Sequence, residues 1–136
     1  MASYKIIDIE GIGDAYAPKL QAIGIEKVED LLEKGASAKG RKEIAEQTGI
    51  SPKLILTWVN HADLFRVKGV GPQFSELLEA AGVDTVKEFA TRKPENLAPK
   101  LLEVNEAKHL VRRVPVLVEV VKMVEYAKTH EPNVTY

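Results

Sequence analysis

The sequence contains no cysteine, which excludes disulfide bonds, thiolate catalysis and zinc sites with cysteine ligands. It also lacks an apolar run of the roughly 18 or more residues that a transmembrane helix needs. The most apolar stretch, residues 114–124, is interrupted by Pro115, Glu119 and Lys122. The first residues show no basic segment followed by a long apolar one, so we expect neither a secretory signal nor contact with a membrane.

An excess of charge of one sign is also missing. There are 19 Lys and Arg residues against 20 Asp and Glu residues, for a formal net charge of -1 at pH 7. Proteins that coat nucleic acid by bulk electrostatics usually carry a strong basic excess. The balance excludes that class, and any nucleic-acid contact must therefore rest on a local site.

What the sequence does contain is an internal repeat at an offset of 58 residues, in which residues 9–32 align without a gap over residues 67–90. Such self-similarity is the signature of a repeated supersecondary unit. A looser alignment, with a gap of seven residues, extends the repeat to later apolar positions. The pairs in the two alignments include Gly11/Gly69, Gly13/Gly71, Leu20/Leu78, Gly24/Gly82, Val28/Val86, Trp58/Met123 and Ala62/Ala127.

The spacing of apolar residues predicts helices throughout, with Pro72 at the first position of one helix and Gly24 and Gly82 as helix stops. We expect an all-α fold of two tandem units, residues 1–66 and 67–130, in one compact domain, followed by a flexible tail over 131–136. Tyr4–Ile9 fits either a short strand or one turn of helix. The expected helices cover residues 14–23, 27–34, 41–48, 52–65, 72–81, 85–92, 106–113 and 115–129.

Each unit carries a loop of the form Gly-apolar-Gly, Gly11-Ile12-Gly13 in the first and Gly69-Val70-Gly71 in the second. The middle side chain is expected to point into the core, and Gly71 is expected to need a positive φ. Amides that converge in the loop and at the start of the following helix can hold a phosphate oxygen. The alternative is a purely structural turn, which needs glycine with or without a ligand.

The pattern apolar-x-Gly-apolar-Gly-x-x-x-small-x-x-apolar resembles the helix-hairpin-helix motif of DNA repair and replication proteins. Together with Thr48-Gly49-Ile50-Ser51 and Trp58-Val59, the chain is similar to a bacterial and archaeal family of small proteins described as domain of unknown function 4332. The hairpin resemblance implies that paired loops grip the phosphate backbones of double-stranded DNA without reading sequence. It also implies that hairpin carbonyls can hold a monovalent cation.

The charges beside the two loops differ. Asp8, Glu10 and Asp14 flank the first loop, whereas Arg66 and Lys68 precede the second. If one loop binds phosphate, we expect the second. Two other basic groups are candidates for the same surface, or else solvated faces. They are Lys39, Arg41 and Lys42, at an expected helix start, and Lys108, Arg112 and Arg113, with Lys108 and Arg112 expected on one face of a helix.

Catalytic patterns are absent from the sequence. His61, His109 and His130 lack the spacing of metal ligands, and no nucleophile motif or phosphate-cradling Walker loop occurs. We therefore expect no enzymatic activity, cofactor, metal or small-molecule substrate. The leading hypothesis is a cytoplasmic, sequence-nonspecific DNA-binding module, associated with the nucleoid. The alternative is a protein–protein adaptor that keeps the same scaffold with little or no DNA affinity.

Overall fold

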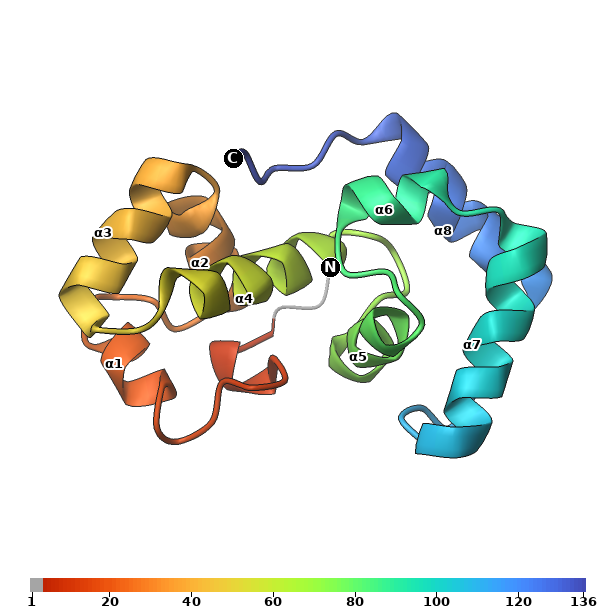
Figure 1. Cartoon of the computed structure of the whole chain (residues 1–136), viewed down its shortest axis with the longest axis horizontal. Helices are drawn as coiled ribbons and strands as arrows, with labels where there is room; N and C mark the ends of the chain where they lie inside the picture. Colours follow the sequence, from red (N-terminus) through yellow and green to blue (C-terminus); the bar gives the residue numbers. More distant parts are fainter. Residues whose placement is uncertain (1–3) are drawn as a thin grey trace. The chain divides into compact units, whose positions relative to one another are not determined.

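The computed structural model describes residues 4–136, and every regular element that it shows among them is a helix (Figure 1). This confirms the all-α prediction. One 3-10 turn, η1 (Ile6–Asp8), precedes the α-helices. These are α1 (Ala17–Gln21), α2 (Val28–Gly35), α3 (Ala38–Thr48), α4 (Pro52–Leu64), α5 (Pro72–Ala80), α6 (Val86–Thr91), α7 (Pro94–Lys108) and α8 (Leu117–Thr129).

The first of two compact units extends to Asp63 and also includes Asn133–Tyr136. In it α3 packs against α2 and α1. Gly40 allows a close approach, because a Cβ atom there would lie 2.0 Å from the carbonyl oxygen of Lys34. Burying the apolar face of each helix supplies the main stabilisation. The buried side chains include Ile6, Ile9, Ile12, Leu20, Ile25, Leu31, Ile44, Ile55, Trp58 and Val59.

The second unit spans Leu64–Pro132 and has its own hydrophobic core. In this unit α8 packs against α6 and α7, and α5 packs against α7. Thr85 begins α6 by accepting a hydrogen bond from the Glu88 amide at 3.0 Å, as an N-cap residue does. The core contains Val67, Val70, Phe74, Leu77, Leu78, Val83, Phe89, Leu97, Leu101, Val120 and Val124.

The sequence repeat is reproduced in the backbone at the same offset. Gly11 and Gly69 both have φ of +94°, and Gly24 and Gly82 have φ of +86° and +96°. Both members of each pair therefore occupy the left-handed region that favours glycine. The equivalent hydrogen bonds are Ile12 N to Ile9 O (3.1 Å) and Val70 N to Val67 O (3.0 Å), and Ile25 N to Leu20 O (3.0 Å) and Val83 N to Leu78 O (2.8 Å).

Several expected helix boundaries are wrong, among them the start at residue 41, since α3 begins at Ala38. The first-unit helix expected from residue 14 begins at Ala17, because the Gly13 carbonyl accepts the amides of Tyr16 and Ala17 in a preceding turn. The helix expected over 106–113 is the end of α7, which begins at Pro94 and ends at Lys108. His109 adopts φ of +51° there and closes the helix.

Asn105 explains why α7 stops where it does. Its side-chain oxygen accepts the amides of Leu110 (2.8 Å) and Val111 (3.0 Å), and its amide nitrogen donates to the Val111 carbonyl at 3.0 Å. These three bonds satisfy backbone groups that a continued helix would use, and they turn the chain away from the helix axis. Residues 109–116 are consequently a loop.

Tyr4–Ile9 combines the two conformations considered for it. Lys5 forms an isolated antiparallel bridge with Lys27, and Ile6–Asp8 then make a 3-10 turn. The Ile6 amide donates to the Glu26 carbonyl, and the Val28 amide donates to Tyr4. This pairing attaches the start of the described chain to the beginning of α2.

Residues 133–136, expected as part of a flexible tail, are instead attached to the first unit. The Thr135 amide donates to the Ala36 carbonyl at 2.7 Å, and Val134 is buried. The Asn133 amide donates to the Asp63 carboxylate at 3.2 Å. One buried aliphatic side chain and two backbone amides are thus among the contacts that hold this segment in place.

Candidate nucleic-acid interface

The loop of the second unit runs from Arg66 to the start of α5. Gly69 takes the positive φ, and Gly71 is the N-cap residue of α5 with an extended backbone (φ -117°). The expectation of a positive φ at Gly71 is therefore wrong, since that conformation belongs to Gly69. Val70 is buried, as expected for the anchoring side chain, and Pro72 occupies the first helical position.

This loop leaves several backbone donors available. The Val70 amide is used in the turn, donating to the Val67 carbonyl. Because Pro72 has no N–H, the first amides of α5 are those of the next two residues. From Gly69 to Phe74, the amides that donate to no acceptor among residues 4–136 are those of Gly69, Gly71, Gln73 and Phe74. A loop and a helix start thus provide four donors within six residues.

The two cations before this loop differ in their environment. The Lys68 side chain is exposed. Arg66 is half-buried, and its Nη2 atom donates to the Glu131 carbonyl at 3.2 Å. Lys68 is consequently the cation available beside the Gly69–Gly71 amides, while Arg66 is engaged within its own unit.

The loop of the first unit has the same turn but a poorer setting for an anion. Its helix α1 has only five residues, and the Gly13 carbonyl accepts the amides of its N-cap residue, Tyr16, and of its first residue, Ala17. Glu10 and Asp14 are exposed beside the loop, and Asp8 accepts the Lys5 amide at 3.0 Å. Ile12 is buried like Val70, so the first loop resembles the second in architecture more than in electrostatics.

Each loop glycine is covered by the last long helix of its own unit. A Cβ atom at Gly11 would lie 3.2 Å from Trp58 Nε1, and one at Gly69 would lie 2.9 Å from Met123 Cε. Trp58 and Met123 are equivalent in the looser sequence alignment, and both are buried. As expected, Trp58 is a core residue; its ring centroid lies 5.2 Å from that of Tyr16.

The basic cluster at the start of α3 divides into two kinds of side chain. Lys39 and Lys42 are exposed, whereas Arg41 is only 7% exposed. Arg41 donates to the carbonyl oxygens of Gly35 (2.8 Å) and Ala36 (3.0 Å) and to that of Thr135. Burial lowers the pKa of the guanidinium from its ordinary value, and the interaction with Tyr136 opposes that change. The expected role of Arg41 on a basic surface is therefore wrong.

The second basic cluster does not form a helical face. Lys108 lies in the last turn of α7, while Arg112 and Arg113 lie in the following loop, so the expected pairing of Lys108 with Arg112 is wrong. Arg113 donates to both carboxylate oxygens of Glu119, which lowers the pKa of Glu119 and raises that of Arg113. All three basic side chains are exposed.

Two cations that the sequence comparison did not single out lie at equivalent places in the repeat. Lys34 Nζ donates to the Ile23 carbonyl at 2.8 Å, and Arg92 Nη2 donates to the Gly82 carbonyl at 2.9 Å. They are 58 residues apart, two positions beyond the aligned segment. A cation that bonds to terminal carbonyls complements the negative end of a helix. Extending the alignment by two residues would have identified this shared feature.

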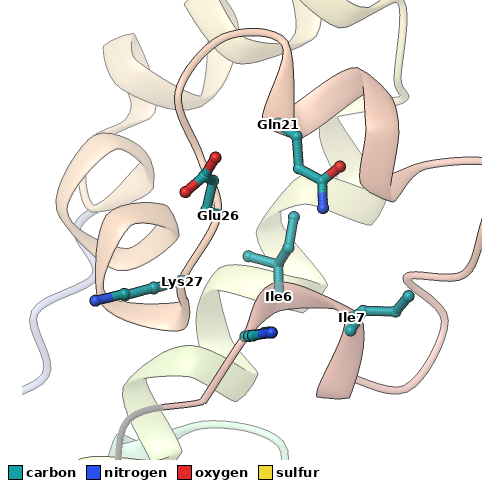
Figure 2. Close-up of a pocket in the computed structure, with 6 residues that line it drawn as sticks. Ile6, Ile7, Gln21, Glu26 and Lys27 are labelled. Carbon is teal, nitrogen blue, oxygen red and sulfur yellow. The ribbon is translucent and has the colours of Figure 1, made fainter.

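A shallow hollow of about 200 Å³ lies in the first unit beside the bridge between Lys5 and Lys27. Figure 2 shows Ile6 and Gln21 directed toward it and Lys27 directed away. Its lining combines aliphatic atoms with exposed polar side chains. In residues 4–136, no three His, Asp or Glu side chains are grouped as metal ligands would be.

The two units thus define an all-helical protein in which a glycine loop, a short helix and a carbonyl-capping cation recur. A sequence profile of the family described as domain of unknown function 4332 matches residues 10–130, and the chain belongs to this family. Comparisons with curated proteins and with solved structures return no match. Among the described helices, none combines the length and the apolar character needed to cross a membrane.

Proposed function

We propose that the protein is a non-enzymatic module that binds the phosphate backbone of double-stranded DNA without reading its sequence. The observation that carries the proposal is the second loop, where four amides without a protein acceptor lie next to the exposed Lys68. Backbone amides at a helix start are suitable donors to a phosphate oxygen, and they carry no information about base identity.

The weak net charge sets the expected strength of binding. Phosphate contacts release counterions, so log Kd changes with log salt by roughly 0.9 per contact on duplex DNA. A chain with a net charge of -1 should make few contacts and bind weakly at physiological salt. A fluorescence anisotropy titration of two unrelated labelled duplexes, at low and at physiological salt, tests this. Equal affinities and a shallow salt slope are expected, and absence of binding at low salt would contradict the proposal.

A protein-binding adaptor is the second candidate, and a different observation favours it. The start of α8 exposes adjacent aliphatic side chains, with Val116 at 54%, Leu117 at 49% and Val118 at 59% exposure. Clusters of exposed apolar residues mark interaction surfaces more often than isolated ones do. Recovery of one specific protein from nuclease-treated extract by the wild type, and its loss with Val118→Asp, is expected for an adaptor. Loss of every partner on nuclease treatment counts against it.

A further inference from the structure

The last four residues of the chain, Asn133–Tyr136, form a segment that we call the strap. It has no helical structure, and it belongs to the first unit although it follows the second in sequence. Figure 1 shows this end of the chain near α2 and α3. The whole second unit separates the strap in sequence from the rest of the first unit. The strap therefore contacts the first unit as a separate short peptide would.

Three hydrogen bonds of the strap involve its backbone, and the Thr135 hydroxyl adds a fourth to the Ala36 carbonyl at 3.3 Å. The Asn133 amide donates to Asp63, the Thr135 amide donates to the Ala36 carbonyl, and Arg41 donates to the Thr135 carbonyl. Backbone contacts of this kind accept an extended segment of varied sequence. Ala36, Arg41, Asn60 and Asp63, which we call the strap surface, lie between α2 and α3, on α3 and on α4.

Two side chains of the strap add selectivity. Val134 is 6% exposed, so it is the aliphatic anchor. Tyr136 is 77% exposed, yet its ring lies 5.7 Å from Arg41 Cζ and its hydroxyl lies 3.3 Å from Asn60 Oδ1. An aromatic residue two positions after an aliphatic one is therefore the side-chain pattern that this surface contacts.

We propose that the strap surface is a recognition site for an extended peptide with an aliphatic residue and, two positions later, an aromatic residue. The strap is its ligand in cis. Asn133, Thr135 and Tyr136 are all exposed, and only one side chain is buried, so the segment belongs to the least stable part of the unit. A partner peptide of the same pattern can replace it. This proposal does not depend on DNA binding.

A synthetic peptide with the sequence of residues 130–136, with neutral ends, is the probe. It is titrated into two ¹⁵N-labelled full-length chains, the wild type and Val134→Asp, whose own strap cannot bury a carboxylate. We expect saturable shifts of the Ala36, Arg41, Asn60 and Asp63 amides in the variant. The wild type should need at least tenfold more peptide, because its tethered strap competes at an effective concentration in the millimolar range.

The control is the same peptide carrying V134D, which should shift none of these amides. A second full-length variant, Thr135→Pro, removes the amide that donates to Ala36 and keeps the buried valine. It gives the same test if Val134→Asp unfolds the first unit. Absence of saturable shifts in both variants overturns the proposal. Formation of a concentration-dependent dimer without peptide binding also overturns it, since the surface would then serve exchange of straps between copies.

Discussion

Met123 Cε lies 2.9 Å from the place where a Cβ atom would stand on Gly69. The last helix of the second unit therefore closes directly over the loop that precedes its first helix. Gly69 is constrained twice, by a φ of +94° and by this contact, whereas Gly71 next to α5 has an extended backbone that any residue can adopt. The conformational requirement of the loop is concentrated at its first glycine.

Gly69→Ala should lower the free energy of unfolding by about 1–3 kcal/mol, because alanine is strained at positive φ and its methyl group meets Met123. Two controls separate these causes. Gly49→Ala has a positive φ of +74° with open space, so it should show the backbone cost alone, and Gly13→Ala, with neither constraint, should change stability little. Urea unfolding followed by circular dichroism measures all three. Equal stability of Gly69→Ala and Gly13→Ala would show that the loop tolerates a side chain.

Arg41→Met should destabilise the protein by roughly 1–3 kcal/mol, because the carbonyls of Gly35, Ala36 and Thr135 lose a donor. Lys42→Met is the matched control on the same helix, since Lys42 is exposed; its effect should stay within about 0.5 kcal/mol. Thermal unfolding of the two variants is the measurement. A similar melting temperature for both variants would show that Arg41 contributes no more to stability than the exposed Lys42 does.

Removal of the carbonyl-capping cations should destabilise both units. Lys34→Met should reduce stability by about 0.5–1.5 kcal/mol, the net value of one hydrogen bond, and Arg92→Met by at least as much, because Arg92 also donates to Glu88. Lys87→Met, at an exposed position of α6, is the control and should be near neutral. Urea unfolding of the three variants provides the comparison. If Lys87→Met costs as much as the other two, the shared carbonyl contacts do not explain the loss.

The pair of Arg113 and Glu119 should give a pH dependence of known sign. The bonds from Arg113 and from the Val116 amide lower the pKa of the Glu119 carboxyl below its ordinary value. Any stability that the pair supplies is therefore present above the unfolded pKa of about 4.3 and is lost as the pH falls through the lower folded pKa. An NMR titration of Glu119 should show this lowered pKa. Arg113→Gln should raise it, and an unchanged titration would assign the shift to the backbone amide alone.

The repeat made much of the fold predictable. Glycines at identical offsets fixed the ends of equivalent helices, and apolar spacing located Val70 and Trp58 in the cores. The helix α7 was misplaced because Pro94 and Pro99 are typical of a loop. Pro94 instead takes the first helical position, which needs no amide, and the exposed Pro99 deprives only the carbonyl of Glu95, which is also exposed.

The candidate site was less predictable than the fold. Charge alone places Arg41 beside Lys39 and Lys42 on a basic surface, but its guanidinium also donates to the carbonyl of Thr135, 94 residues further along the chain. Such long-range partners leave no local pattern. The attachment of the strap could not be predicted from the sequence for the same reason. It depends on how α2, α3 and α4 are placed around Thr135 and its neighbours.

The most direct test of the phosphate-binding role is a comparison of charge reversals at the two loops. Lys68→Glu places a carboxylate beside the Gly69 and Gly71 amides and should weaken binding to all duplex sequences alike. Lys5→Glu, beside an already acidic loop, should have a smaller effect, and Arg112→Glu tests the basic loop after α7. These variants are titrated against one labelled duplex at low salt. We predict a large loss of DNA affinity for Lys68→Glu alone. An unchanged affinity for Lys68→Glu would contradict a phosphate site at the second loop, whether Lys5→Glu lowers the affinity or no variant does.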